Sequence, residues 1–264
     1  MKKILFIAFI LTLCNLNANL VKADITPLDL TFDNASGQIN DAWFYEAGIA
    51  PTGTGNINSF LVLNGGIRDK KTSPAYKIEE GYNTDGTLEF DTMNNHTRSL
   101  LLSEVSLVTL DGKEGTYREF ILDINQKQNE GSTYLSLDEI EIYLSTNPDN
   151  TGYPSLGTKV WELDGTGDTW IKLDSALNEG SGKGDMYAYI PEYVFAGYNP
   201  DTTYLYLYSL FGAQGLPGET WGWNDGFEEW AVSKGEGTVV PVPGAVLLGM
   251  LGISIAGIKL RKVV

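Results

Sequence analysis

The side chains best suited to chemistry lie between Trp221 and Trp230, where the sequence reads WGWNDGFEEW. Exposed indole rings stack on the faces of sugars, and a glutamate beside them can act as the general acid or the nucleophile of a glycosidase. The stretch is therefore a candidate glycan-binding or glycan-hydrolysing site. Its candidate residues are Trp221, Trp223, Trp230, Glu228 and Glu229.

The same stretch has a purely structural interpretation, which we favour. Neighbouring residues of a strand point to opposite faces of the sheet, so Glu228 and Glu229 cannot by themselves form the facing pair of carboxylates that glycoside hydrolysis requires. Asn224–Gly226 consists of typical turn residues. Phe227–Val232 then predicts a final strand that closes a β-sandwich.

The counts of cysteine and histidine exclude several classes of active site. Cys14, in the N-terminal segment, is the only cysteine, and His96 is the only histidine. Thiol nucleophiles, thiolate zinc sites and haem attachment are thereby excluded from the rest of the chain, as are metal sites built on two histidines. A Ser/His/Asp triad would depend on His96, whose polar, turn-like surroundings are typical of a solvated side chain. We therefore predict no catalytic residue.

Calcium is the small ligand that the sequence favours, and no other cofactor is predicted. Calcium binds about six to eight oxygen atoms from carboxylates, amides and backbone carbonyls in loops. Asp and Asn are also common in turns for conformational reasons alone, so such loops are equally explained without a metal. The candidate loops are Asn147–Asn150, Asp164–Asp168 and Glu179–Asp185, with Asp164 and Asp168 as the candidate metal-binding pair.

The chain is strongly acidic. It has 18 basic and 34 acidic residues, and six of the basic ones lie in the two terminal segments, which leaves 12 against 34, a net charge of −22, between them. Such a surface repels nucleic acid and anionic lipid. It favours cations and neutral polymers such as extracellular polysaccharide as partners, although acidity also serves simply to keep an exported protein soluble.

Between its ends the sequence predicts an all-β fold. Apolar residues alternate with polar ones in short runs that are separated by Gly, Asn and Asp, the pattern of half-buried antiparallel strands. This spacing predicts a two-sheet antiparallel sandwich of jelly-roll type. The runs are Ser59–Leu63, Leu100–Leu110, Phe120–Ile124, Ile140–Leu144, Lys159–Leu163, Thr169–Leu173, Met186–Ile190 and Tyr204–Tyr208.

Tyrosines recur at alternate positions in two of these runs. Tyr187 and Tyr189 lie in one, and Tyr204, Tyr206 and Tyr208 lie in another. They would form either an exposed aromatic ladder that binds glycans or proteins, or cross-strand pairs within the sandwich. The pattern favours neither interpretation.

The N-terminus predicts export. Lys2 and Lys3 precede an apolar run from Ile4 to Leu13, and a small-residue cleavage site ends at Ala23. A basic start, a short apolar run and such a site are typical of a secretory signal peptide, here residues 1–23. The remaining chain up to residue 237 is then one acidic β-sandwich ectodomain.

The C-terminus predicts a membrane segment over residues 238–264. No charged residue occurs in the 21 positions from Thr238 to Ile258, a run long enough for one transmembrane helix. Lys259, Arg261 and Lys262 follow it as a basic stop. The positive-inside rule places this end in the cytoplasm and the ectodomain outside.

The residues directly before this helix carry a resemblance to a known family. They are Val240, Pro241, Val242, Pro243 and Gly244. A Pro-x-Pro element, an apolar helix and a short basic end together resemble the PEP-CTERM sorting signal of bacteria that export exopolysaccharide. Val242 replaces the glutamate that names the signal, so this tail resembles a VPxPG-type variant.

The resemblance implies an exosortase, a membrane protease-transferase, as partner, with Val240–Gly244 as its recognition and cleavage region. The mature protein would then join the cell surface or the extracellular matrix as a non-catalytic protein. The stretch from Asn224 to Trp230 also resembles the end of PEP-CTERM ectodomains, which adds no activity. The alternatives are a carbohydrate-binding or glycan-acting module, and a protein held permanently by its C-terminal helix.

Overall fold

The computed structural model describes residues 27–47, 57–64, 78–126, 133–165, 167–178, 184–214, 221–224 and 226–233. The predicted signal peptide (residues 1–23) and the predicted tail (residues 238–264) lie outside these described residues, and with them Val240–Gly244 and the basic stop of Lys259, Arg261 and Lys262. Within the described ranges, no helix is long and apolar enough to cross a membrane.

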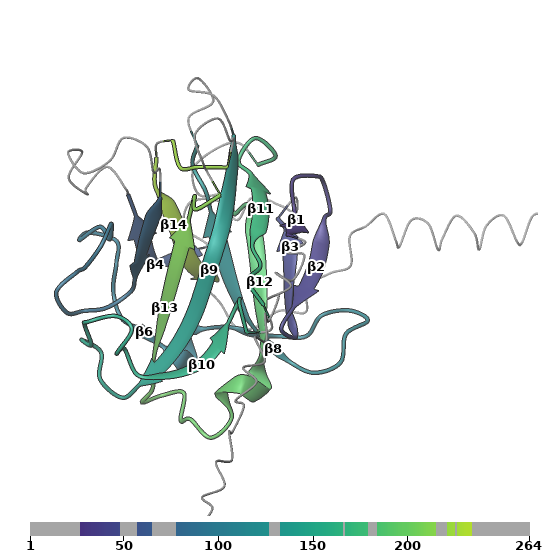
Figure 1. Ribbon diagram of the computed structural model, residues 1–264. Helices are drawn as coiled ribbons and strands as arrows, with labels where there is room; N and C mark the ends of the chain where they lie inside the picture. Colours follow the sequence, from purple (N-terminus) through teal and green to yellow (C-terminus); the bar gives the residue numbers. More distant parts are fainter. Residues whose placement is uncertain are drawn as a thin grey trace, which may run out of the picture.

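The described residues form two β-sheets that lie face to face (Figure 1). The first sheet contains, in spatial order, β1 (Leu28–Asp29), β11 (Ile171–Asp174), β9 (Tyr134–Ser145), β13 (Tyr204–Phe211) and β5 (Glu79–Tyr82), with β10 (Thr158–Glu162) beside β9 and β6 (Leu100–Leu101) beside β13. The second contains β2 (Ser36–Ile39), β3 (Ala42–Glu46), β12 (Met186–Pro191), β8 (Tyr117–Asp123), β14 (Glu228–Ser233) and β4 (Ile57–Leu63), with β7 (Leu107–Val108) beside β8.

The strand directions confirm the predicted all-β antiparallel sandwich. Among the described strands, every pair is antiparallel except β1 with β11, which is parallel. Among the described residues, the short 3-10 helices η1 (Leu102–Glu104) and η3 (Glu192–Phe195) lie between strands.

The inner faces of the two sheets form the hydrophobic core. Alternate residues of each strand point inward, as the sequence pattern predicts, and Phe120, Leu122 and Ile142 are fully buried. Trp230 of β14 reaches from the second sheet to the first, where its indole N–H donates to Ser209 Oγ at 3.1 Å. Each large apolar side chain that is buried in this way stabilises the fold by about 1.5–3 kcal/mol.

The segment from Leu100 to Leu110 is not the single strand that its apolar pattern predicts. It is divided into β6, the helix η1 and β7. Arg118 of β8 holds the divided segment in place: its buried guanidinium donates to the backbone oxygens of Leu102 (2.5 Å) and Val105 (2.8 Å) and pairs with Glu192. A tertiary interaction therefore overrides the local strand preference.

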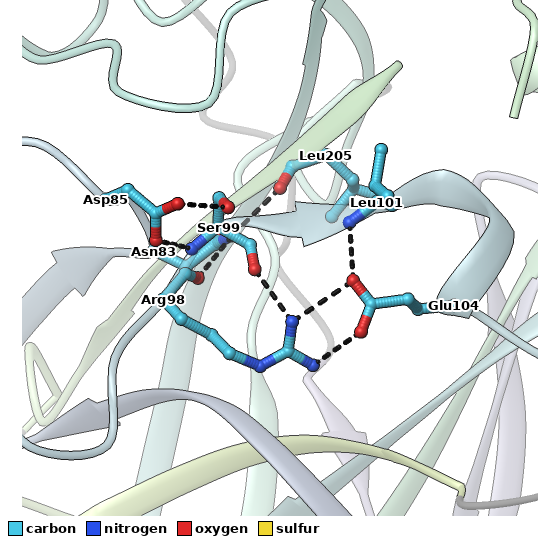
Figure 2. A network of polar contacts seen from close by, with 7 residues as sticks. All are labelled: Asn83, Asp85, Arg98, Ser99, Leu101, Glu104 and Leu205. Atoms are coloured by element: carbon cyan, nitrogen blue, oxygen red, sulfur yellow. Dashed lines mark hydrogen bonds and ion pairs between the residues drawn. The ribbon is translucent and has the colours of Figure 1, made fainter. Parts of the chain in front are cut away.

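Polar contacts hold the segments around η1 against the edge of the first sheet, as Figure 2 shows. The Arg98 guanidinium pairs with Glu104, with Nη2 2.9 Å from Oε2. Asn83 is fully buried, and its amide N–H donates to the Leu205 oxygen at 2.8 Å. Its side-chain oxygen accepts the Leu207 N–H at 2.7 Å. One amide thus satisfies two backbone groups of β13.

The tyrosine-rich runs lie on the outer faces of different sheets, so they do not form one ladder. On the first sheet, Tyr206 and Tyr208 are buried, and Tyr153 from the β9–β10 loop stacks on Tyr208 with ring centroids 4.0 Å apart. On the second sheet, Tyr187 and Tyr189 stack on one another at 5.9 Å. Tyr206 and Tyr208 therefore pack against neighbouring strands and a loop and do not form an exposed ladder.

Candidate functional site

Two of the five candidate glycan-binding residues are part of the core. Trp230 and Glu228 are both 0% exposed. Both side chains point inward from β14, where Glu228 is paired with Leu63 of β4. A sugar in solvent cannot reach either side chain in this conformation.

Glu228 carries a fully buried carboxyl group. Burial raises its pKa well above the usual value, and the nearby backbone N–H of Asn125 offsets this only in part. Among the described residues, neither carboxyl oxygen has a partner in hydrogen-bonding geometry, and the same holds for Trp223 Nε1 and Gln126 Nε2. Burial favours the protonated carboxyl, because the ionised form would lose its hydration without compensation.

Glu229 points to the opposite side of β14 and is half-buried on the outer face of the second sheet, as the strand geometry predicts. The Ser59 hydroxyl donates a hydrogen bond to its carboxylate. Burial raises the pKa of Glu229, and the charge of the exposed His96 acts in the other direction. Because the serine is bonded to the carboxylate and not to an imidazole, these side chains do not have the order of a Ser/His/acid triad.

Trp221 belongs to a row of three aromatic rings, Tyr134, Trp221 and Trp170, which we call the aromatic row. The ring centroid of Trp221 is 5.1 Å from that of Tyr134 and 5.4 Å from that of Trp170. Lys172 Nζ lies 5.4 Å from the Trp221 centroid and 5.8 Å from the Trp170 centroid. Tyr134 is 37% exposed, and both indoles are half-buried.

The aromatic row lies on the outer face of the first sheet, where β1, β11 and β9 pair. Leu135 of β9 and Leu173 of β11 are paired and buried in the core, so their neighbours Tyr134 and Lys172 point outward. Lys172 also forms an ion pair with Asp29 of β1, with Nζ 3.5 Å from Oδ2. The row is thus bordered by one cation and one carboxylate.

Carboxylates follow further along the outer face of β9. Glu139 is half-buried there, and its pKa is raised first by burial and then by the negative charges of Glu141, Asp164 and Glu80. Lys159 neutralises part of this charge, with its Nζ 2.9 Å from Glu141 Oε1. This part of the face remains negative and presents hydrogen-bond acceptors.

The predicted calcium pair, Asp164 and Asp168, lies in the turn between β10 and β11. Asp164 Oδ1 accepts the Thr169 N–H at 2.9 Å, so the carboxylate helps to close its own turn. Burial raises the pKa of Asp164, and the neighbouring charge of Asp168 adds to the shift. In the described part of the chain, no group of three or more Asp, Glu, His or Cys side chains is arranged to hold a metal ion. Calcium binding stays a prediction.

Comparisons with protein-family models, with curated protein sequences and with solved structures found no match for this chain. The site is therefore interpreted from its own geometry. Trp221 is recognisable as a candidate from the sequence, whereas Tyr134, Trp170 and Lys172 are not, because they come from other parts of the chain. The only local signal is the strand period: Tyr134 and Lys172 each precede a leucine that points inward, so their own side chains point outward.

Proposed function

We propose that this chain is an exported bacterial protein of the cell surface or extracellular matrix, with a non-catalytic β-sandwich of jelly-roll type outside the membrane. The observation that carries the proposal is the C-terminal sequence, in which Val240–Gly244 precedes an uncharged run and a basic end. Its resemblance to a PEP-CTERM signal makes an exosortase-type enzyme the partner. The N-terminal signal-peptide pattern supports the same route of export.

The C-terminal mass of the protein recovered from the native cell surface and medium tests this proposal. We expect a mature chain that ends near Pro243 and lacks the apolar segment. The double substitution Pro241→Ala and Pro243→Ala should leave the tail uncleaved, whereas the control Val239→Ala, just outside the motif, should be processed normally. An intact chain ending at Val264, found only in the membrane fraction, would instead establish a permanent membrane anchor.

A second candidate function is a carbohydrate-binding module, and the observation that favours it is the place of Trp221 on the outer face. Of the five candidate residues, Trp221 stands in an aromatic cluster with accessible ring surface. Binding of soluble polysaccharides to the full chain, measured by affinity electrophoresis, tests this function. Release of reducing sugars from the same polymers would show hydrolysis and contradict a non-catalytic domain.

A further inference from the structure

We propose that the aromatic row binds a neutral polysaccharide, with Tyr134, Trp221 and Trp170 as the stacking surface and Lys172 and Asp29 as the polar border. The inference rests on the carbohydrate-binding function and deepens it. It assigns the site to one end of the first sheet and names the chemical class of the ligand.

The accessible ring surface is the first argument. On the outer face of the same sheet, Tyr206 and Tyr208 are by contrast buried. Tyr134 is 37% exposed, and Trp221 and Trp170 keep part of their surface in solvent. The C–H face of a sugar ring packs on such surfaces, and aromatic rings provide a large apolar area with few rotatable bonds.

The polar border supplies the second argument. Sugar hydroxyl groups both donate and accept hydrogen bonds, and an ammonium beside a carboxylate offers both functions. Lys172 Nζ and Asp29 Oδ2 are 3.5 Å apart, and both side chains are partly exposed. Asp29 is held in place because it accepts hydrogen bonds from the N–H (3.1 Å) and the hydroxyl (2.6 Å) of Thr31.

The charge of the molecule selects a neutral ligand. The central region carries a net charge of −22 once the basic residues of the two terminal segments are set aside. The outer face beside the aromatic row adds the carboxylates around Glu139, and Lys172 is already paired with Asp29. A polymer rich in uronic acids would be repelled, whereas the hydroxyl groups of a neutral polymer can donate to the carboxylates.

The strands hold the rings in place before a ligand arrives. The backbone oxygen of Trp221 accepts the Ser136 N–H of β9 at 2.9 Å, and that of Trp170 accepts the Leu28 N–H of β1 at 2.9 Å. Both indoles therefore stand on segments that are hydrogen-bonded to the sheet. Ordering side chains on binding opposes affinity, so rings that are already positioned lose less free energy when they bind.

The test is affinity electrophoresis of the full chain through gels that contain a soluble β-glucan, a galactomannan or alginate. We expect retardation by at least one of the two neutral polymers and none by alginate. Trp221→Ala and Trp170→Ala should each weaken binding about tenfold, which corresponds to about 1.4 kcal/mol. Trp43→Ala is the matched control. Trp43 is a half-buried tryptophan of the second sheet with Lys113 Nζ 3.4 Å from its ring centroid, and its substitution should leave binding unchanged.

Tyr134→Ala separates loss of binding from loss of folding, because this ring is the most exposed of the row and its removal should disturb the fold least. It should weaken binding about threefold or more with an unchanged melting temperature. Binding that survives in the Tyr134 and Trp170 variants would overturn the site while leaving the carbohydrate-binding function standing. Tighter binding to alginate than to the neutral polymers would overturn the ligand class. Failure of all three polymers to bind the unaltered chain would reject both the site and the function.

Discussion

Replacing Glu228 by glutamine should remove a loss of folding stability that the unaltered protein suffers as the pH rises. Burial in the folded protein raises the pKa of this carboxyl well above 4.5, the ordinary value at which it ionises in the unfolded chain. The unfolded state therefore releases a proton that the folded state keeps, and the unaltered protein loses stability as the pH rises from about 4.5 to the raised pKa of the folded state. Glutamine has nearly the same shape and does not titrate in this range.

The magnitude follows from proton linkage. One proton of difference between the two states changes the free energy of unfolding by about 1.4 kcal/mol for each pH unit. In a domain of this size, about 1 kcal/mol shifts the melting temperature by roughly 2–4 °C, so the advantage of Glu228→Gln should grow by roughly 3–6 °C per pH unit. At pH 4.5 and below, the two proteins should have nearly equal stability.

Urea denaturation of both proteins between pH 4.5 and pH 7.5 measures this difference directly. Other buried acids, such as Asp185 and Glu119, also have raised pKa values because of burial, but they occur in both proteins and cancel. Glu229→Gln is the matched control in the same strand, and the difference in stability between this variant and the unaltered protein should change less with pH because that carboxyl is only half-buried. A difference between Glu228→Gln and the unaltered protein that stays constant over the whole range would refute the reasoning.

Three further measurements test the fold and its ligands. Asn83→Ala should lower the free energy of unfolding by about 2–5 kcal/mol in urea titrations, because it leaves the Leu205 oxygen and the Leu207 N–H buried without partners; a loss below about 1 kcal/mol would contradict this. Gly226→Ala should destabilise the protein by more than about 1 kcal/mol, because φ is +101° and an added Cβ would lie 2.0 Å from the Asn125 oxygen. Equal stability of the variant and the unaltered protein would contradict this close contact. If calcium binds the folded chain, EDTA should lower the melting temperature by several degrees, and superimposable melting curves would contradict the predicted calcium site.

The strands that the sequence identified have apolar residues at alternate positions on their inward face. In β9, Ile140, Ile142 and Leu144 alternate with Glu141 and Tyr143, so the period of two is visible without the structure. The strand β8 is buried at every position, and only its inward residues Phe120 and Leu122 follow this period. The sequence pattern did not predict the strand β3, because aromatic residues occupy both of its faces, with Phe44 in the core and Trp43 and Tyr45 outside. The strand β5 was not predicted either, because it contains a buried acid, Glu79, and a glycine, neither of which is typical of strands.

The candidate site was only partly predictable for a different reason. Composition marks the stretch from Trp221 to Trp230, but it cannot separate a ring in the core from a ring on the surface. Tyr134, Trp170 and Lys172 approach Trp221 only because β9 and β11 pair, and that pairing is a long-range event that no local pattern encodes. A site assembled from several strands thus requires the strand order before its members can be recognised.

Within ten residues, the stretch from Trp221 to Trp230 divides its aromatic rings between the surface and the core. Trp221 lies over the first sheet, and its backbone oxygen accepts the Ser136 N–H. The chain then crosses to the second sheet through a bend that includes Gly226, where only a glycine fits against the Asn125 backbone. Trp230 follows inside the sandwich and donates to Ser209 on the opposite sheet. Because one short segment joins both sheets at this end, it couples the closure of the core to the position of Trp221, and a tryptophan-rich stretch that suggests a single binding surface serves two separate purposes.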